Sequence, residues 1–162
     1  MDRTRTLRGA LAGTVAAGVW LAQQPLDKRI FDWPHDDAEL LGRLTGVGPS
    51  AGAVLHLANG ALFGAVYSAV APATRVPAKL RGPAAGLLEH LATWPLTALA
   101  APELTSSPRA FAQSTWRHLL FGTVLGELER RLNPEPLEPV SDAAVASNGH
   151  GSAAHLVASG PR

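Results

Sequence analysis

Five residues that carry a charge or an imidazole interrupt stretches of sequence that are otherwise almost entirely apolar. They are His56, Glu89, His90, Arg117 and His118. Imidazoles titrate near neutral pH and bind transition metals, and a neighbouring carboxylate can exchange protons with them. The combination allows three kinds of site: a structural network of hydrogen bonds and ion pairs, a path for protons or a small ion, and a metal or haem site that uses histidines from different helices.

The chain lacks the residue patterns of most catalytic and cofactor sites. It has no cysteine in 162 residues, which excludes disulfides, thiolate metal sites and cysteine nucleophiles. No H-E-x-x-H helix, phosphate-binding Walker loop or serine nucleophile elbow is present. The net charge of +1 gives no reason to expect a nucleic-acid partner. The sequence therefore assigns no catalytic residue, no cofactor and no bound metal, and it favours a protein that is not an enzyme.

Four long segments must position the five polar residues, because most charges of the chain are clustered between these segments. They comprise residues 8–26, 50–71, 82–102 and 109–131. Each has the roughly 20 mainly apolar residues that a helix needs to cross a hydrocarbon core. The stretch from Leu44 to Thr74 holds no charge in 31 positions, whereas a soluble amphipathic helix carries polar and charged residues along one face. We therefore predict an all-α integral membrane four-helix bundle surrounded by the lipid bilayer, in preference to an Ala-rich soluble bundle.

The basic residues predict the orientation of these spans. Eight flank one face and four flank the other: Arg3, Arg5, Arg8, Arg75, Lys79, Arg81, Arg130 and Arg131 against Lys28, Arg29, Arg43 and Arg109. Short loops rich in Lys and Arg stay in the cytoplasm, so both termini are predicted to be cytoplasmic. The first basic segment also resembles a secretory signal, but no A-x-A cleavage site follows it. We therefore predict a multi-pass protein of the cytoplasmic (inner) membrane.

Two segments are predicted to lie outside the spans. Residues 27–49 form an outer loop, in which Asp36 and Glu39 have the spacing that caps a short helix through Leu44. Residues 133–162 are rich in Pro, Ser and Gly without periodicity, and we predict a disordered cytoplasmic tail after the transmembrane domain of residues 1–132.

Two short strings recur in the spans and indicate a duplicated two-helix hairpin. The second and fourth spans share H-L-x2-G-x3-G, and the first and third share R-G-x2-A-G. Each span thus contains a pair of glycines four residues apart, Gly9 and Gly13, Gly60 and Gly64, Gly82 and Gly86, and Gly122 and Gly126. Small residues let helices approach closely in lipid. We expect the pairs to pack inside the bundle, with a homo-oligomer through the glycine-rich faces as the alternative.

The same spacing places the three histidines of the spans at one depth. Each stands four residues from a glycine pair on the same helix face, so His56, His90 and His118 form a layer in the outer half of the bundle. We expect Glu89 to pair with Arg117 or with a histidine and to fix the register of the helices. A haem held between His56 and His118, or a proton path through the layer, are the alternatives.

The segment from Val54 to Leu132 resembles the YagU-type family of uncharacterised bacterial inner-membrane proteins. The resemblance rests on a histidine in the second span, a basic link containing proline, and G-x3-G followed by E-H in the third span. It continues with W-P-L, Pro102, and a fourth span that opens with R-H-L and ends with E-x-E-R-R-L. It implies four spans in the cytoplasmic membrane and no established activity. The sequence thus predicts a membrane protein of unknown activity with a structural polar layer.

Overall fold

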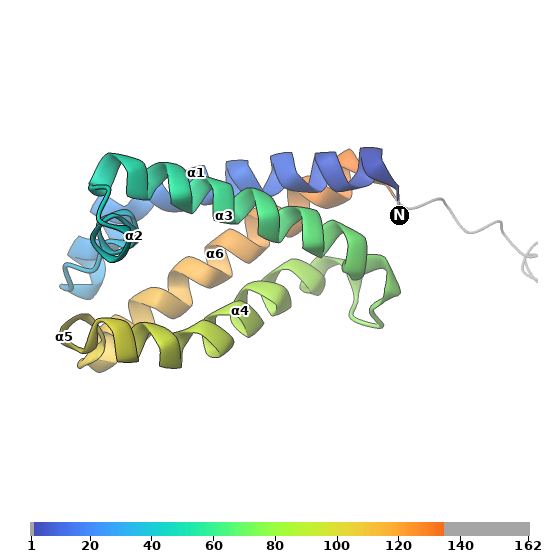
Figure 1. The fold of residues 1–162 in the computed structure, drawn as a ribbon. Helices are drawn as coiled ribbons and strands as arrows, with labels where there is room; N and C mark the ends of the chain where they lie inside the picture. Colours follow the sequence, from blue (N-terminus) through green and yellow to red (C-terminus); the bar gives the residue numbers. More distant parts are fainter. Residues whose placement is uncertain (1, 135–162) are drawn as a thin grey trace, which may run out of the picture.

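The computed structural model describes residues 2–134, and this part of the chain contains helices and no strand, which confirms the predicted all-α class (Figure 1). The elements are α1 (Arg3–Phe31), α2 (Asp37–Thr45), α3 (Pro49–Val70), the 3-10 turn η1 (Ala71–Ala73), α4 (Ala78–Ala100), α5 (Pro102–Thr105) and α6 (Pro108–Leu132). The four long helices include the four predicted spans apart from a residue or two at some ends. The predicted tail comprises residues 133–162, and the structure describes its first two residues, Asn133 and Pro134. The rest of the predicted tail lies outside the described residues.

The first helix is longer than predicted. Asp2 begins it by accepting hydrogen bonds from the backbone N–H groups of Thr4 and Arg5, at 2.9 and 3.3 Å. The prediction that an outer loop begins at Asp27 is wrong, because α1 continues past Pro25 to Phe31. Proline removes a single backbone donor, and the buried contacts of Asp27 described below hold the following turn in place. The loop is therefore confined to residues 32–36 and 46–48, on either side of α2.

The predicted capping of the short outer helix is confirmed. The Asp36 carboxylate accepts a hydrogen bond from the backbone N–H of Glu39 at 3.0 Å, and α2 starts at Asp37. Gly46 ends the helix in the left-handed conformation, with φ 72°. This geometry fixes Asp37 in the first turn of α2, where its side chain reaches Trp20 of α1 and Arg117 of α6.

The glycine pairs bring the long helices together two by two. Gly9 and Gly13 of α1 lie against Gly60 and Gly64 of α3, so closely that a methyl group added to any of the four would collide with backbone or side-chain atoms of the facing helix. In α4 and α6, Gly82, Gly86, Gly122 and Gly126 repeat this arrangement. A second copy of the chain could reach these glycines only if the two helices separated.

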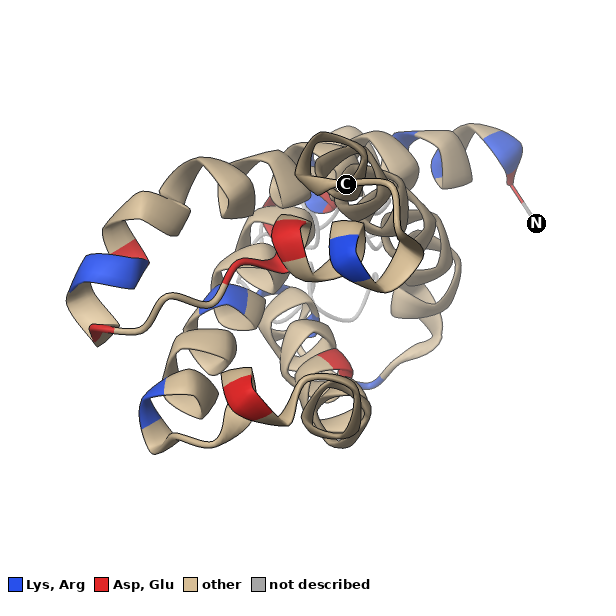
Figure 2. Cartoon of the chain, turned by 60° about the vertical axis from the view of Figure 1, so that its left-hand side comes forward, with Lys and Arg blue, Asp and Glu red and all other residues tan. Residues whose placement is uncertain are grey.

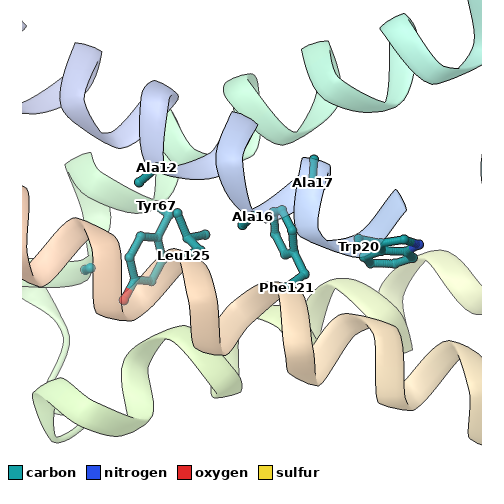
Figure 3. Close-up of a cluster of buried hydrophobic side chains, with 8 residues drawn as sticks. Ala12, Ala16, Ala17, Trp20, Tyr67, Phe121 and Leu125 are labelled. Carbon is teal, nitrogen blue, oxygen red and sulfur yellow. The ribbon is translucent and has the colours of Figure 1, made fainter. Parts of the chain in front are cut away.

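Helix α6 joins the two pairs, because it packs on both α4 and α1, whereas α3 and α4 make almost no direct contact. Figure 1 shows α6 crossing behind the space between α3 and α4. A small apolar core fills the α1–α6 junction: Ala12, Ala16, Phe121 and Leu125 are buried in it (Figure 3). The bundle is thus closed on the α1 and α6 side and open between α3 and α4.

One helical stretch within residues 2–134, Pro49–Ala73, is long and apolar enough to cross a membrane by its length and composition. This is fewer than the four spans predicted. Helices α1, α4 and α6 are as long but more polar, since they contain Gln23 and Gln24, Glu89 and His90, and Arg117 and His118 respectively. Charged residues nevertheless lie mainly toward the ends of the long helices and in the links between them (Figure 2).

Candidate functional site

The centre of the polar layer is Arg117, whose side chain is completely buried. Its guanidinium donates two hydrogen bonds to the two carboxylate oxygens of Asp27 on α1, both 2.6 Å long. It donates a third to Asp37 of α2 at 2.6 Å and a fourth to the backbone carbonyl of His35 at 2.9 Å. One side chain of α6 therefore binds two other helices and the loop between them, with the forked geometry that makes arginine–carboxylate pairs strong.

Neutral side chains complete this ion-pair cluster. Gln113, one turn before Arg117, donates to Asp27 Oδ1 at 2.8 Å, and Gln23 donates to Asp27 Oδ2 at 2.5 Å. The indole N–H of Trp20 donates to Asp37 Oδ2 at 3.0 Å. Buried charges are tolerated only when such partners replace the lost water. The cluster has almost all of its hydrogen-bonding capacity filled, and the oxygen Oε1 of Gln113 is the exception.

The carboxyl groups at the start of α2 are held in the charged form. Burial alone would raise the pKa of Asp37, but the hydrogen bond from His35, 3.1 Å long, and the positive charge of Arg117 outweigh it, so the pKa lies well below its usual range. Burial would also raise the pKa of Asp36, and the hydrogen bond from Lys28, 2.6 Å long, outweighs it to give a lowered pKa. Both carboxylates are therefore stable partners for the cations beside them.

The expected pair between Glu89 and Arg117 does not form, and neither does a pair between Glu89 and a histidine. Arg117 and His118 are neighbours in sequence, so their side chains leave α6 about 100° apart around the helix axis. Arg117 points to α1 and α2, and His118 points into the space between α3 and α4. Glu89 is half-buried, and its hydrogen-bonding neighbour is the amide of Asn59 on α3. Within residues 2–134, Glu89 makes no ion pair with a Lys, an Arg or a His.

The three histidines do lie together, as a chain of ring contacts from α3 to α4. The indole of Trp20 contacts His56 and His118, with ring centres 5.1 and 4.7 Å away. The ring centre of His118 is 4.9 Å from that of His90. The indole therefore lies against both His56 and His118, which leaves no room for a haem bound between those two rings.

Hydrogen bonds place a proton on one ring nitrogen of two of the histidines. His118 Nδ1 is 2.8 Å from the backbone oxygen of Ser114, which can only accept, so Nδ1 carries the proton. The hydroxyl of Thr115 donates to the backbone oxygen of Phe111 and therefore accepts from His90 Nε2, 3.0 Å away. His90 Nδ1 is then free to accept from the Ser114 hydroxyl at 3.2 Å. His56 differs from both, because its Nε2 is buried without a hydrogen-bond partner in the described structure.

A cavity of about 300 Å³ lies where these side chains meet. Four of the five predicted polar residues line it, namely His56, Glu89, His90 and His118, together with Trp20, Trp94, Asn59 and Asp37. Arg117 does not line it. The leucines of α2 and the end of α4 form its outer wall, so it opens on the side of the bundle where α3 and α4 separate.

A second polar cluster, which the sequence did not predict, joins α1 to α6 at the opposite end of the bundle. Arg5 donates to Glu129 Oε1 at 2.7 Å, and Ser68 of α3 donates to the same oxygen at 3.1 Å. Asn133 adds a hydrogen bond of 3.2 Å to it. Between this cluster and the cavity lies the apolar core of Ala12, Ala16 and its neighbours (Figure 3).

The described side chains offer no ready-made metal centre. In residues 2–134, no three His, Asp or Glu side chains are grouped so that they could hold a metal ion. Asp36 and Asp37, which are close in sequence to His35, are used by Lys28 and Arg117 instead.

Sequence reasoning missed Asp27, Asp37 and Trp20, which carry the cluster around Arg117. Asp27 was assigned to a loop, and Trp20 was interpreted as an anchor at the membrane interface, whereas its side chain is buried. Comparison of the chain with protein-family models, with curated proteins and with solved structures gives no match.

Proposed function

We propose that the protein is a four-span integral membrane protein in which the buried polar layer holds two helical hairpins together. The observation that carries the proposal is that the bundle buries polar side chains and exposes apolar ones, the reverse of a water-soluble protein. The six largest fully buried side chains are Arg117, Leu125, His90, Gln113, Asp27 and Ser68, and five of these are polar. A water-soluble bundle buries its large apolar side chains and exposes its polar ones.

The outer surface of the long helices has the opposite character. Leu88 and Leu99 of α4 expose 70% and 82% of their surface, and Leu7 of α1 and Leu62 of α3 expose 72% and 66%. Similar residues continue along the same faces, including Leu11, Val15, Val19, Val54, Val66, Val70, Leu80 and Leu91. Apolar surface of this extent is characteristic of contact with lipid or with another protein. Small residues at helix contacts and polar residues in the interior are typical of bundles in membranes.

The two glycine-packed pairs support a duplicated hairpin, with α1 and α3 as one copy and α4 and α6 as the other. Both ends of the described chain lie at the same end of the bundle, since Arg8 donates to the backbone oxygen of Leu132 at 3.0 Å. The excess of basic residues at that end favours a cytoplasmic location for it. This arrangement is also what the resemblance to the YagU-type family implies, and membership in that family is part of the proposal.

The polar layer fits a structural function better than a proton or ion path. The cavity brings the three histidines and Glu89 together, which favours an exchange of protons within it. A path across the bundle would have to continue to the cluster around Glu129, and the buried core of Ala12, Ala16, Phe121 and Leu125 separates the two. We therefore propose that the polar layer joins the helices beside an apolar core, and that the monomer conducts no protons or small ions.

The proposed topology can be tested by chemical labelling, because the chain has no cysteine of its own. Arg43→Cys and Arg75→Cys are matched variants, each replacing an exposed arginine outside the four long helices. We expect a membrane-impermeant maleimide to label Arg43→Cys in intact cells, and to label Arg75→Cys only after the cells are opened. Recovery of the protein in the soluble fraction, or equal labelling of both variants in intact cells, would contradict the proposal.

A further inference from the structure

Two cavities lie along the open side of the bundle, and Glu89 lines both of them. The outer one, of about 300 Å³, is the cavity beside the histidines. The inner one, of about 380 Å³, is lined mainly by apolar residues of α3 and α4, with Arg81 at its cytoplasmic end. Glu89 is thus a carboxylate that lines both spaces, and the side chains packed between the helices fill neither of them.

The charges around the outer cavity do not balance. Arg117 forms a bidentate pair with Asp27, at 2.6 Å, and Asp37 is hydrogen-bonded by both Arg117 and His35. The charges of these four groups cancel when His35 is protonated. Glu89 remains, and its neighbour Asn59 is neutral. Burying a carboxylate without an opposite charge is costly and is relieved by a proton or by a bound cation, and no Lys or Arg among the cavity's lining residues supplies that charge.

The walls of the outer cavity suit a cation with an apolar surface. No Lys or Arg lines it, whereas the indoles of Trp20 and Trp94 and the ring of Phe121 do. Aromatic rings attract organic cations through their negative faces and tolerate the alkyl groups that such cations carry. His90 and His118 each use one ring N–H in a hydrogen bond to an oxygen of α6. A volume of about 300 Å³ is at the lower end of the range for small-molecule sites.

We propose that this cavity binds a small organic cation of the quaternary ammonium class, with its charge beside the Glu89 carboxylate and its apolar groups against the indole rings. The inference depends on the cavity and not on the membrane topology proposed above, so each can fail while the other holds. A quaternary ammonium group carries a permanent charge and no N–H, and the site matches this by supplying a carboxylate and aromatic rings.

Equilibrium dialysis of radiolabelled benzyltrimethylammonium against the full-length protein in detergent tests the proposal. We expect saturable binding of one cation per chain. Glu89→Gln keeps the shape of the side chain and removes its charge, and we expect it to weaken binding at least tenfold. Glu103→Gln makes the same chemical change on an exposed side chain outside the cavity, and we expect its affinity to stay within twofold of the parent.

Two further measurements keep the outcome clear. Glu89→Asp retains the charge and should bind within a few-fold of the parent, and Glu89→Gln should keep the parental thermal midpoint in detergent, so that its loss of binding reflects the lost charge and not misfolding. The uncharged carbon analogue neopentylbenzene should displace the cation at least tenfold less well than unlabelled benzyltrimethylammonium does. The proposal is overturned if the parent shows no saturable binding, or if Glu89→Gln binds the cation as tightly as the parent.

Discussion

At the residue scale, the chemistry of the site depends on which buried charges have partners. Burying an unpaired cation inside a bundle costs free energy, so Arg117 was expected to pair with a carboxylate. Sequence reasoning could not identify the partner, since Asp27 and Asp37 are 90 and 80 residues away in sequence and are brought to Arg117 only by the packing of α1 and α2. Glu89 was the nearest candidate in the apolar segments, and it lies on the other side of α6.

Acidification should destabilise the protein through Asp37. The pKa of this carboxyl is lowered below the value of about 3.9 expected in the unfolded chain. The folded state therefore binds fewer protons, and the stabilisation is complete above about pH 4 and is lost as the pH falls through the folded pKa. We expect the thermal midpoint in detergent to fall between pH 6 and pH 2.5, and to fall less steeply in Asp37→Asn. The exposed Asp32→Asn serves as the control and should keep the parental slope; equal slopes for Asp37→Asn and the parent would refute the assignment.

At the element scale, glycine spacing sets which helices pair. The pairs four residues apart were visible in the sequence, and so was their recurrence in each half of the chain. Their effect on packing follows from size alone, because backbone atoms of the facing helix occupy the place of a side chain. Gly18 of α1 shows the contrast, since the nearest atom to an added methyl group there is Leu57 Cδ2, 4.0 Å away.

Gly13→Ala and Gly18→Ala form a matched pair of substitutions within one helix. At Gly13 the new methyl group would collide with the backbone oxygen of Gly60, and we expect a loss of about 1–3 kcal/mol in unfolding free energy, as for other overpacked sites. At Gly18 the methyl group has room, and alanine favours the helix by up to about 1 kcal/mol. Denaturant unfolding in mixed micelles measures both, and similar losses at the two positions would show that the α1–α3 contact is not the cause.

The location of the four long helices and the position of the histidine layer could be predicted, and the end of α1 and the pairing of side chains across the bundle could not. Apolar length located the four long helices, and 3.6-residue periodicity placed His56, His90 and His118 on faces that meet in the cavity. The first span was predicted to end at Leu26, because charged residues follow it, whereas tertiary contacts of Asp27 extend the helix to Phe31. The cluster around Glu129 was missed because Arg5, Ser68 and Asn133 have no pattern in sequence that links them.

At the scale of the whole molecule, glycine contacts and polar clusters hold different parts of the bundle together. Glycines join the helices within each pair, α1 with α3 and α4 with α6. The two pairs meet through α1 and α6, where a buried ion pair lies at each end of the junction, Arg117 with Asp27 and Arg5 with Glu129. The apolar residues between these clusters are mostly alanines on the α1 side, so the polar clusters are the contacts that distinguish the correct arrangement of the pairs from others.

This division predicts the behaviour of a chain split between Arg75 and Val76, in the link that joins the pairs. Co-expressed halves should purify together in mild detergent, because every contact between α1 and α6 remains available. Asp27→Asn combined with Glu129→Gln removes one carboxylate from each cluster, and breaking a buried pair costs about 3–5 kcal/mol. Since 1.4 kcal/mol corresponds to a tenfold change in affinity, we expect association of the halves to weaken at least a hundredfold.

The control is a second double variant, Asp32→Asn with Glu127→Gln, which makes the same change of charge at exposed pairs. It should leave recovery of the partner half nearly unchanged. If the two double variants lose the partner half equally, net charge and not the buried clusters would govern assembly.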